Sequence, residues 1–214
     1  VWLMYRHHCH KNKINSFKSL VDNKWLKFET EQELWFSYLP TQKDEVYNAT
    51  AKIGKFYAMY YELFPSELDK IRIQKILNYL SRVQNTDGSW GYSVKAPYVD
   101  HFHTCFNLES IFYMHKVIQT ESSTKMFNSA LADYELNCFE GNQPLHFHKK
   151  RKPKDVRSNI IETEIRDIAN AIILFSTIGN YSRALDIVNY SLDKYYNRQK
   201  KFFYFFHNKF YMSK

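Results

Sequence analysis

The segment Val99-Asp100-His101-Phe102-His103-Thr104 carries the residue types best suited to acid–base chemistry in this chain of 214 residues. An imidazole and a carboxylate can exchange protons near neutral pH. A helix is expected to begin here, with Asp100 as its N-cap and His103 in its first turn. Because the amino end of a helix favours the neutral imidazole, His103 is the first candidate for a general base. Two interpretations of Asp100 stay open, a catalytic carboxylate or an ordinary helix cap.

Aromatic loops precede this segment and recur further along the chain. The loop Gln84–Tyr92 returns in degraded form twice, as Asn142–His148 and Asn197–Tyr204. Equivalent aromatic positions, about 57 residues apart, are Trp90, Phe147 and Tyr204. A repeat of this length, with two helical runs and one loop in each unit, predicts stacked helical hairpins.

Three pairs of helical runs fill the repeat. The pairs are Tyr47–Phe64 with Glu67–Val83, His101–Gln119 with Thr124–Leu136, and about Ile160–Ile178 with Ser182–Tyr195. The breaks fall at Pro65, at Glu121–Ser123 and at Gly179, and such short breaks predict antiparallel mates. The run His101–Gln119 is apolar almost all round, which indicates a buried inner helix.

The fold class predicted from these patterns is all-α, an α/α toroid or partial toroid of antiparallel helical hairpins. Alternating aromatics over Lys201–Met212 add a small C-terminal β-hairpin with its turn at His207-Asn208. Residues 1–214 are expected to form a single domain, complete or incomplete. Residues 1–46 are expected as an N-terminal helical segment, from irregular helical spacing over residues 16–40. The start at Val1 and the strand-like end suggest a fragment of a longer repeat protein.

Composition and charge restrict the class of partner. The chain is 44% hydrophobic and 18% aromatic, which is a folding composition, and its richness in Lys, Asn, Ile, Tyr and Phe is typical of A+T-rich bacterial genomes. The net charge of +8 would suit an anionic partner, but only the run Lys149–Lys154 is densely basic. That run is either a solvated loop or a binding patch. Basic residues do not recur at the repeat period, so no nucleic acid partner is expected.

Cysteine usage predicts reduced thiols and a cytoplasmic protein. The chain has three cysteines, Cys9, Cys105 and Cys138, without C-x-x-C spacing. The run His7-His8-Cys9-His10 lacks a defined ligand face, and His101, His103 and Cys105 would point apart on a helix. We therefore expect no metal and no cofactor. No apolar stretch approaches the roughly 20 residues of a membrane helix, so no membrane span is expected.

The motif Gln84-x-x-x-Gly88-x-Trp90 resembles the QW repeat of the terpenoid cyclase and protein prenyltransferase α/α toroids. Residues 47–214 also resemble bacterial toroid proteins of exopolysaccharide biosynthesis, described as VpsJ-like. Their pattern has a W-x-Y loop, an I-D-x-F-H-T helix start, a P-x-Y-Y-H loop and a P-I-D-I-H-x-x-A-Q helix start. Trp90 and Tyr92 match the first loop, and Val99–Thr104 matches the first helix start.

The second half of that pattern matches less well. Pro144–His148 resembles the second loop, with His148 in the place of the histidine. The last helix start resembles Glu164–Asn170 after an insertion across the basic run. There Glu164 replaces Asp and Arg166 replaces His. A guanidinium binds anions but is not an ordinary base, so the resemblance leaves the activity in doubt at Arg166.

In a toroid, the loops before the inner helices gather on one rim of a central cavity, which would bring these residues together. The predicted catalytic residues are His103, Asp100, His148 and Glu164. The predicted substrate-binding residues are Trp90, Tyr92, Tyr98, His101 and Arg166. Structural alternatives stay open for Trp90, as a buried plug between repeats, and for His101, as an exposed residue of the first turn.

This set of residues favours a carbohydrate-active protein of bacterial polysaccharide biosynthesis or modification, acting as a lyase or epimerase by proton transfer. The expected partner is a polysaccharide or oligosaccharide, acidic if Arg166 meets a uronate carboxylate. The alternative is a non-catalytic toroid that binds glycan or scaffolds other proteins. Triterpene cyclases need a D-x-D-D motif and protein prenyltransferases need zinc ligands. Neither is present, which disfavours both activities.

Overall fold

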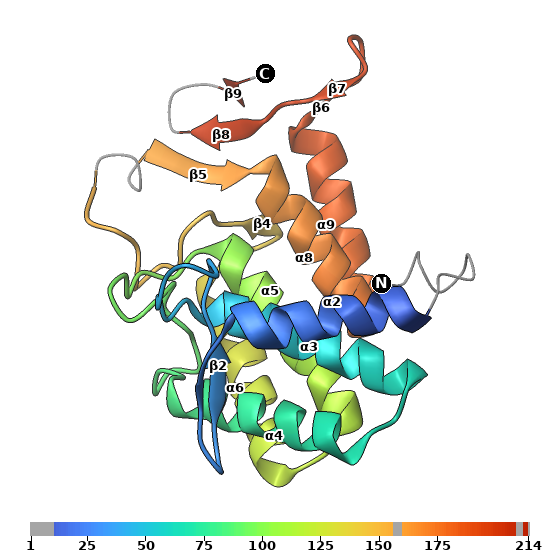
Figure 1. The fold of residues 1–214 in the computed structure, drawn as a ribbon. Coiled ribbons are helices and arrows are strands. Elements are labelled where there is room, and N and C mark those ends of the chain that lie inside the picture. Colours follow the sequence, from blue (N-terminus) through green and yellow to red (C-terminus); the bar gives the residue numbers. More distant parts are fainter. Residues whose placement is uncertain (1–10, 156–159, 209–211, 214) are drawn as a thin grey trace. The chain divides into compact units, whose positions relative to one another are not determined.

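The computed structural model describes residues 11–155, 160–208 and 212–213 (Figure 1). They form two compact units. Unit 1 lies within residues 1–83 and 110–124, and unit 2 lies within residues 84–109 and 125–214. Both are built mainly of helices with short antiparallel strands, which confirms the all-α class of helical hairpins.

Unit 1 begins with a helix and a β-hairpin. These elements are α2 (Lys11–Lys24), β1 (Leu26–Glu29) and β2 (Leu34–Phe36). The helical spacing read over residues 16–40 therefore holds only as far as Lys24, and the strands that follow were not predicted. Thr50 of the next helix explains the position of β2, because its hydroxyl accepts from the Phe36 N–H at 3.0 Å and donates to the Phe36 carbonyl at 3.1 Å.

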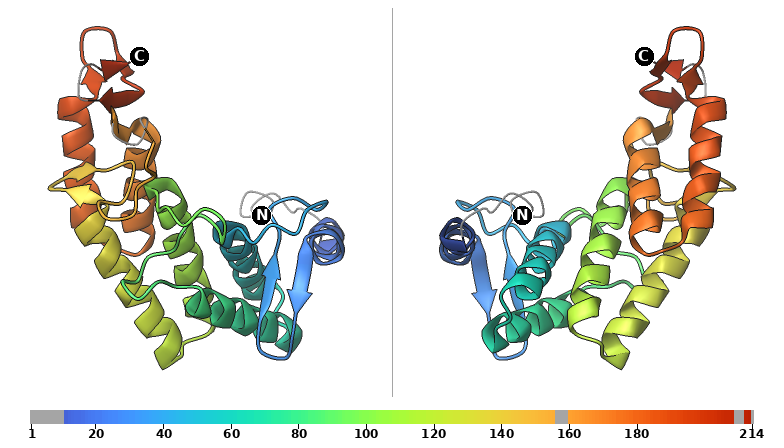
Figure 2. Two further views of the ribbon diagram at one scale, coloured as in Figure 1. Left: turned by 90° about the vertical axis from the view of Figure 1, so that its left-hand side faces the viewer. Right: turned by 90° about the vertical axis from the view of Figure 1, so that its right-hand side faces the viewer.

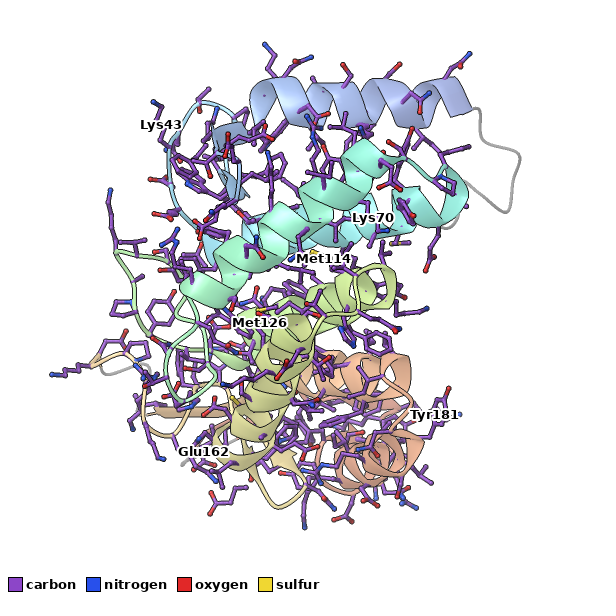
Figure 3. All side chains as sticks on the ribbon, turned by 90° about the horizontal axis from the view of Figure 1, so that it is seen from below. Lys43, Lys70, Met114, Met126, Glu162 and Tyr181 are labelled. Carbon is purple, nitrogen blue, oxygen red and sulfur yellow. The ribbon has the colours of Figure 1, made fainter. Side chains whose placement is uncertain are left out.

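Helices α3 (Tyr47–Leu63) and α4 (Glu67–Arg82) form the first hairpin. Ser66 caps α4 as predicted, since its hydroxyl accepts from the Asp69 N–H. The buried stripe of α4 starts at Ile73, because the predicted members Leu68 and Ile71 are 58% and 51% exposed. In α3, a Cβ on Gly54 would lie 2.3 Å from Sδ of Met114, so only glycine permits this close approach (Figure 3).

The next pair is α5 (His101–Val117) and α6 (Glu121–Asn137). The predicted break at Glu121–Ser123 is wrong, because these residues form the first turn of α6. Thr120 and Ser123 cap that turn reciprocally, with each side-chain oxygen accepting from the other residue's N–H at 3.1 Å. Within unit 2, the start of α5 contacts the end of α6 through His101 and Tyr134, as expected of antiparallel mates.

The rest of unit 2 places a helical hairpin beside short strands (Figure 2). The helices are α8 (Ile165–Thr177) and α9 (Tyr181–Lys194), separated at Gly179, whose φ is +85°. The strands are β3 (Phe139–Glu140), β4 (Gln143–Pro144), β5 (Ile161–Glu164), β6 (Tyr196–Asn197), β7 (Phe202–Phe203), β8 (Phe206–Asn208) and β9 (Met212–Ser213). The small C-terminal hairpin is confirmed as β8 with β9. However, residues 207–208 belong to β8 and not to a turn.

Two strand pairs show the repeat within unit 2. The hairpin β3–β4 follows α6 and the hairpin β6–β7 follows α9, and their first residues, Phe139 and Tyr196, are 57 residues apart. The first loop of the repeat is closed instead by Gln84, whose carboxamide donates to the carbonyls of Gly88 and Met126 at 2.8 and 3.0 Å. The QW-like motif is thus a loop-closing device against α6.

Candidate functional site

A pocket of about 420 Å³ opens in unit 2. Its lining residues are Tyr98, Asp100, Phe102, His103, His146, Phe147, Pro153, Asp155 and Arg166. They come from the starts of α5 and α8 and from the loops on either side of β4. The loops are joined by an isolated antiparallel bridge between Asp100 and Phe147, in which the His101 N–H donates to the His146 carbonyl at 3.0 Å.

His103 is held by the residue that caps its own helix. The Asp100 carboxylate accepts from the His103 backbone N–H at 2.8 Å and contacts the His103 Nδ1 at 2.6 Å. The predicted cap is therefore present, and the same side chain orients the imidazole. Since a carboxylate accepts, Nδ1 carries the proton and Nε2 holds the lone pair of a neutral base. The His103 side chain is 26% exposed.

Aromatic rings surround this imidazole. Tyr92 and Tyr98 stack at 5.7 Å with 6° between their planes, and Tyr92 meets the His103 ring edge-on at 4.7 Å. Phe147 lies edge-on to Tyr98 at 6.3 Å. Such rings offer apolar faces to a ligand in the pocket while they restrict the rotation of His103.

A second histidine, His146, is held in the same manner from α8. Its Nδ1 lies 2.9 Å from Oδ2 of Asp167, and that oxygen also accepts from the Glu164 N–H at 2.9 Å. Burial, the largest influence, lowers the pKa of His146. The hydrogen bond and charge of Asp167, with the charges of Glu164 and Asp100, outweigh burial and leave the pKa raised. His146 is thus biased toward the protonated form.

Arg166 enters the pocket already bound to a carboxylate. Its Nε donates to Oε2 of Glu164 at 2.9 Å, and its Nη2 donates to the same oxygen. The guanidinium also lies over the rings of Phe102 and Phe205, at 5.5 and 6.0 Å from their centroids. Glu164 is itself buried, so it does not line the pocket but sets the charge and direction of Arg166.

Two predicted substrate-binding residues lie in the core. Trp90 is 2% exposed, as in the alternative of a structural plug. His101 is fully buried and not exposed as expected, because its Nε2 bonds to the Tyr134 hydroxyl at 2.9 Å. Burial lowers the pKa of His101, which keeps it neutral.

His148, predicted as catalytic, is also fully buried and belongs to a triad with Asp133 and Asp87. Its Nδ1 accepts from the Lys150 N–H at 3.1 Å, so the ring proton is on Nε2, which faces the two Asp133 oxygens at 3.2 and 3.3 Å. Asp87 pairs with Arg151 at 2.7 Å. The triad has spacing that a metal ion could use, but these hydrogen bonds and this ion pair account for it.

The predicted set is therefore divided. Tyr98, Asp100, His103 and Arg166 share one pocket, and Tyr92 and Glu164 support it. The residues that sequence reasoning missed are His146 and Asp167. His146 stands two positions before His148 in the same loop, and Asp167 stands three positions after the helix-capping Glu164, a spacing typical of reciprocal caps.

The fold matches solved structures of carbohydrate-active α/α toroids. Cellobiose 2-epimerase from Bacillus thermoamylovorans aligns with a TM-score of 0.70 and 13% identity over 93% of this chain and 60% of its own. A sugar epimerase from a ruminal bacterium gives 0.69 and 10%, over 96% and 60%. D-mannose isomerase gives 0.67 and 11%, over 96% and 59%.

The chain thus spans about 60% of the length of these structures. At these identities, the likeness establishes the α/α-toroid fold class. No sequence-family profile matches the chain, and no curated protein matches it by sequence. Among the helices that the structure describes, none is long and apolar enough to cross a membrane.

Proposed function

We propose that this chain is a carbohydrate-active protein whose pocket transfers protons on a sugar, as an epimerase or a lyase. One observation carries the proposal. Two histidines line the same pocket, and a carboxylate orients each of them through Nδ1, at 2.6 Å for His103 and 2.9 Å for His146. Paired imidazoles with opposite protonation are suited to taking a proton and returning one.

The two histidines have distinct roles in this proposal. Neutral His103 removes the proton from a carbon next to a sugar carbonyl, and the electron pair of the C–H bond passes into an enolate. Protonated His146 then gives its proton to the enolate carbon for epimerisation, or to a departing oxygen for elimination. The raised pKa of His146 supports its role as the acid.

The surroundings support a sugar as the substrate. Tyr98 and Phe147 provide ring faces for stacking, and a pocket of about 420 Å³ suits one or two sugar residues. The similar structures include two sugar epimerases and a sugar isomerase. A role in bacterial polysaccharide biosynthesis or modification rests on the sequence resemblance, and a cytoplasmic location rests on the cysteines. The expectation of an acidic glycan rests on Arg166 alone.

A non-catalytic glycan-binding or scaffold protein is the second candidate, and Arg166 favours it. In the sequence pattern that this chain resembles, a histidine stands at this position. Here the guanidinium is bound to Glu164 and cannot take a proton. If that position supplies the essential base, the pocket binds sugar without turning it over.

Proton exchange in deuterated water separates the two candidates. Cellobiose and mannose incubated with the protein should exchange the hydrogen next to the anomeric carbon, as followed by NMR. His103→Gln should abolish exchange and retain most sugar binding. His115→Gln, a histidine of unit 1, is the matched control. Binding without exchange would favour the non-catalytic protein, and no saturable sugar binding would refute both candidates.

A further inference from the structure

The charge around the pocket indicates which class of sugar it accepts, an inference that rests on the proposed carbohydrate site. Asp100 and Asp155 line the pocket, and Glu164 and Asp167 lie directly behind Arg166 and His146. These four carboxylates face a single guanidinium. The sum stays negative even when both histidines are protonated.

Arg166 does not reverse this sign. Its Nε and Nη2 both donate to one oxygen of Glu164, whose side chain is only 2% exposed. The pair is therefore close to neutral when seen from the pocket. A uronate carboxylate would have to compete with this buried partner for the same guanidinium.

The basic run Lys149–Lys154 does not supply the missing positive charge at the wall. Only Pro153 and Asp155 of this loop line the pocket. Lys149 donates to the Leu136 carbonyl at 3.1 Å, and Arg151 pairs with Asp87. The lysines of the run are exposed to solvent, where salt screens their charge.

We propose that the pocket selects amino sugars, whose ammonium group is positive near neutral pH, over uronates, with neutral sugars between them. Two features stabilise the ammonium group. The carboxylates attract it, and the faces of Tyr98, Phe102 and Phe147 favour a cation. The same carboxylates repel a uronate. Selection by charge thus opposes the acidic glycan expected from Arg166 alone.

The test compares the methyl β-glycosides of glucosamine, glucose and glucuronate, which share a ring and have no free carbonyl to turn over. Calorimetric or NMR titration at low salt should show glucosamine binding at least about tenfold more tightly than glucuronate. Added salt should reduce this ratio. Glucuronate binding as tightly as glucosamine would overturn the charge selection alone. Failure of all three to bind would overturn the proposed carbohydrate site itself.

Two variants locate the source of the selection. Asp155→Asn should lower the preference for glucosamine and leave glucose binding unchanged. Glu164→Gln releases Arg166 from its carboxylate and should strengthen glucuronate binding several-fold. Glu140→Gln, an exposed carboxylate on β3, is the control for net charge and should change none of the three. An unchanged ratio in Asp155→Asn, with the fold intact by circular dichroism, would contradict the proposal.

Discussion

Asp167→Asn should lower the pKa of His146 and reverse the direction of its shift. The substitution removes the carboxylate that lies 2.9 Å from the His146 Nδ1, while Glu164, at 3.9 Å from Nε2, and Asp100 remain. An opposite charge at such a distance typically shifts a pKa by about 1–3 units. We expect a fall of about 1–2 units, because the remaining carboxylates keep part of the effect and burial then dominates.

This change has a consequence for stability with a definite sign. The pKa of His146 is raised in the folded protein, so its ion pair stabilises the fold fully below the unfolded pKa of about 6.5. That stabilisation is lost as the pH rises through the folded pKa. The difference in unfolding free energy between wild type and Asp167→Asn should therefore grow as the pH falls, by about 1.4 kcal/mol for each unit of lost shift.

NMR titration of the His146 ring proton measures the pKa, and urea unfolding at mildly acidic and mildly alkaline pH measures the stability. Asp186→Asn, an exposed carboxylate on α9, is the control and should leave both measurements unchanged. A His146 midpoint that does not move in Asp167→Asn would refute the argument that Asp167 sets its protonation.

The remaining predictions concern packing. Trp90→Ala should cost about 3–5 kcal/mol in urea unfolding, because the ring is buried, and a near-neutral effect would contradict its role as a plug. Gly88→Ala should destabilise more than Gly141→Ala: both have positive φ, but a Cβ on Gly88 would lie 2.4 Å from a backbone carbonyl of α6, whereas Gly141 faces open space. Gly54→Ala should lower the melting temperature, and Met114→Ala in the same chain should restore part of the loss. Full additivity of the two changes would contradict that contact.

Helices were predictable where local signals agree. The stop at Gly179, the cap at Asp100 and the buried stripe of α4 each depend on residues within a few positions of one another. The strands β2 and β5 were not predictable in this way. Their backbones are satisfied by Thr50 and by β8, which lie 14 and more than 40 residues further along the chain.

Part of the site was predictable for the same reason. Asp100, His103 and Arg166 stand in or next to first helical turns, whose geometry is local. The choice of His146 over His148 was not, because it depends on the bridge between Phe147 and Asp100. No sequence pattern within the loop itself says which of its histidines faces Asp133 and which faces Asp167.

The attachment of the C-terminal segment to the start of α8 affects how shortened versions of this protein should be judged. The Ile165 N–H, an amide that a helix cannot satisfy internally, donates to the Phe205 carbonyl at 2.7 Å, and the Phe205 ring lies near Arg166. A fragment ending after α9 would lose this acceptor, the ring and the partner strand of β5 at once. Loss of sugar binding in such a fragment would therefore reflect a missing wall, and residues beyond α9 belong in any minimal binding unit.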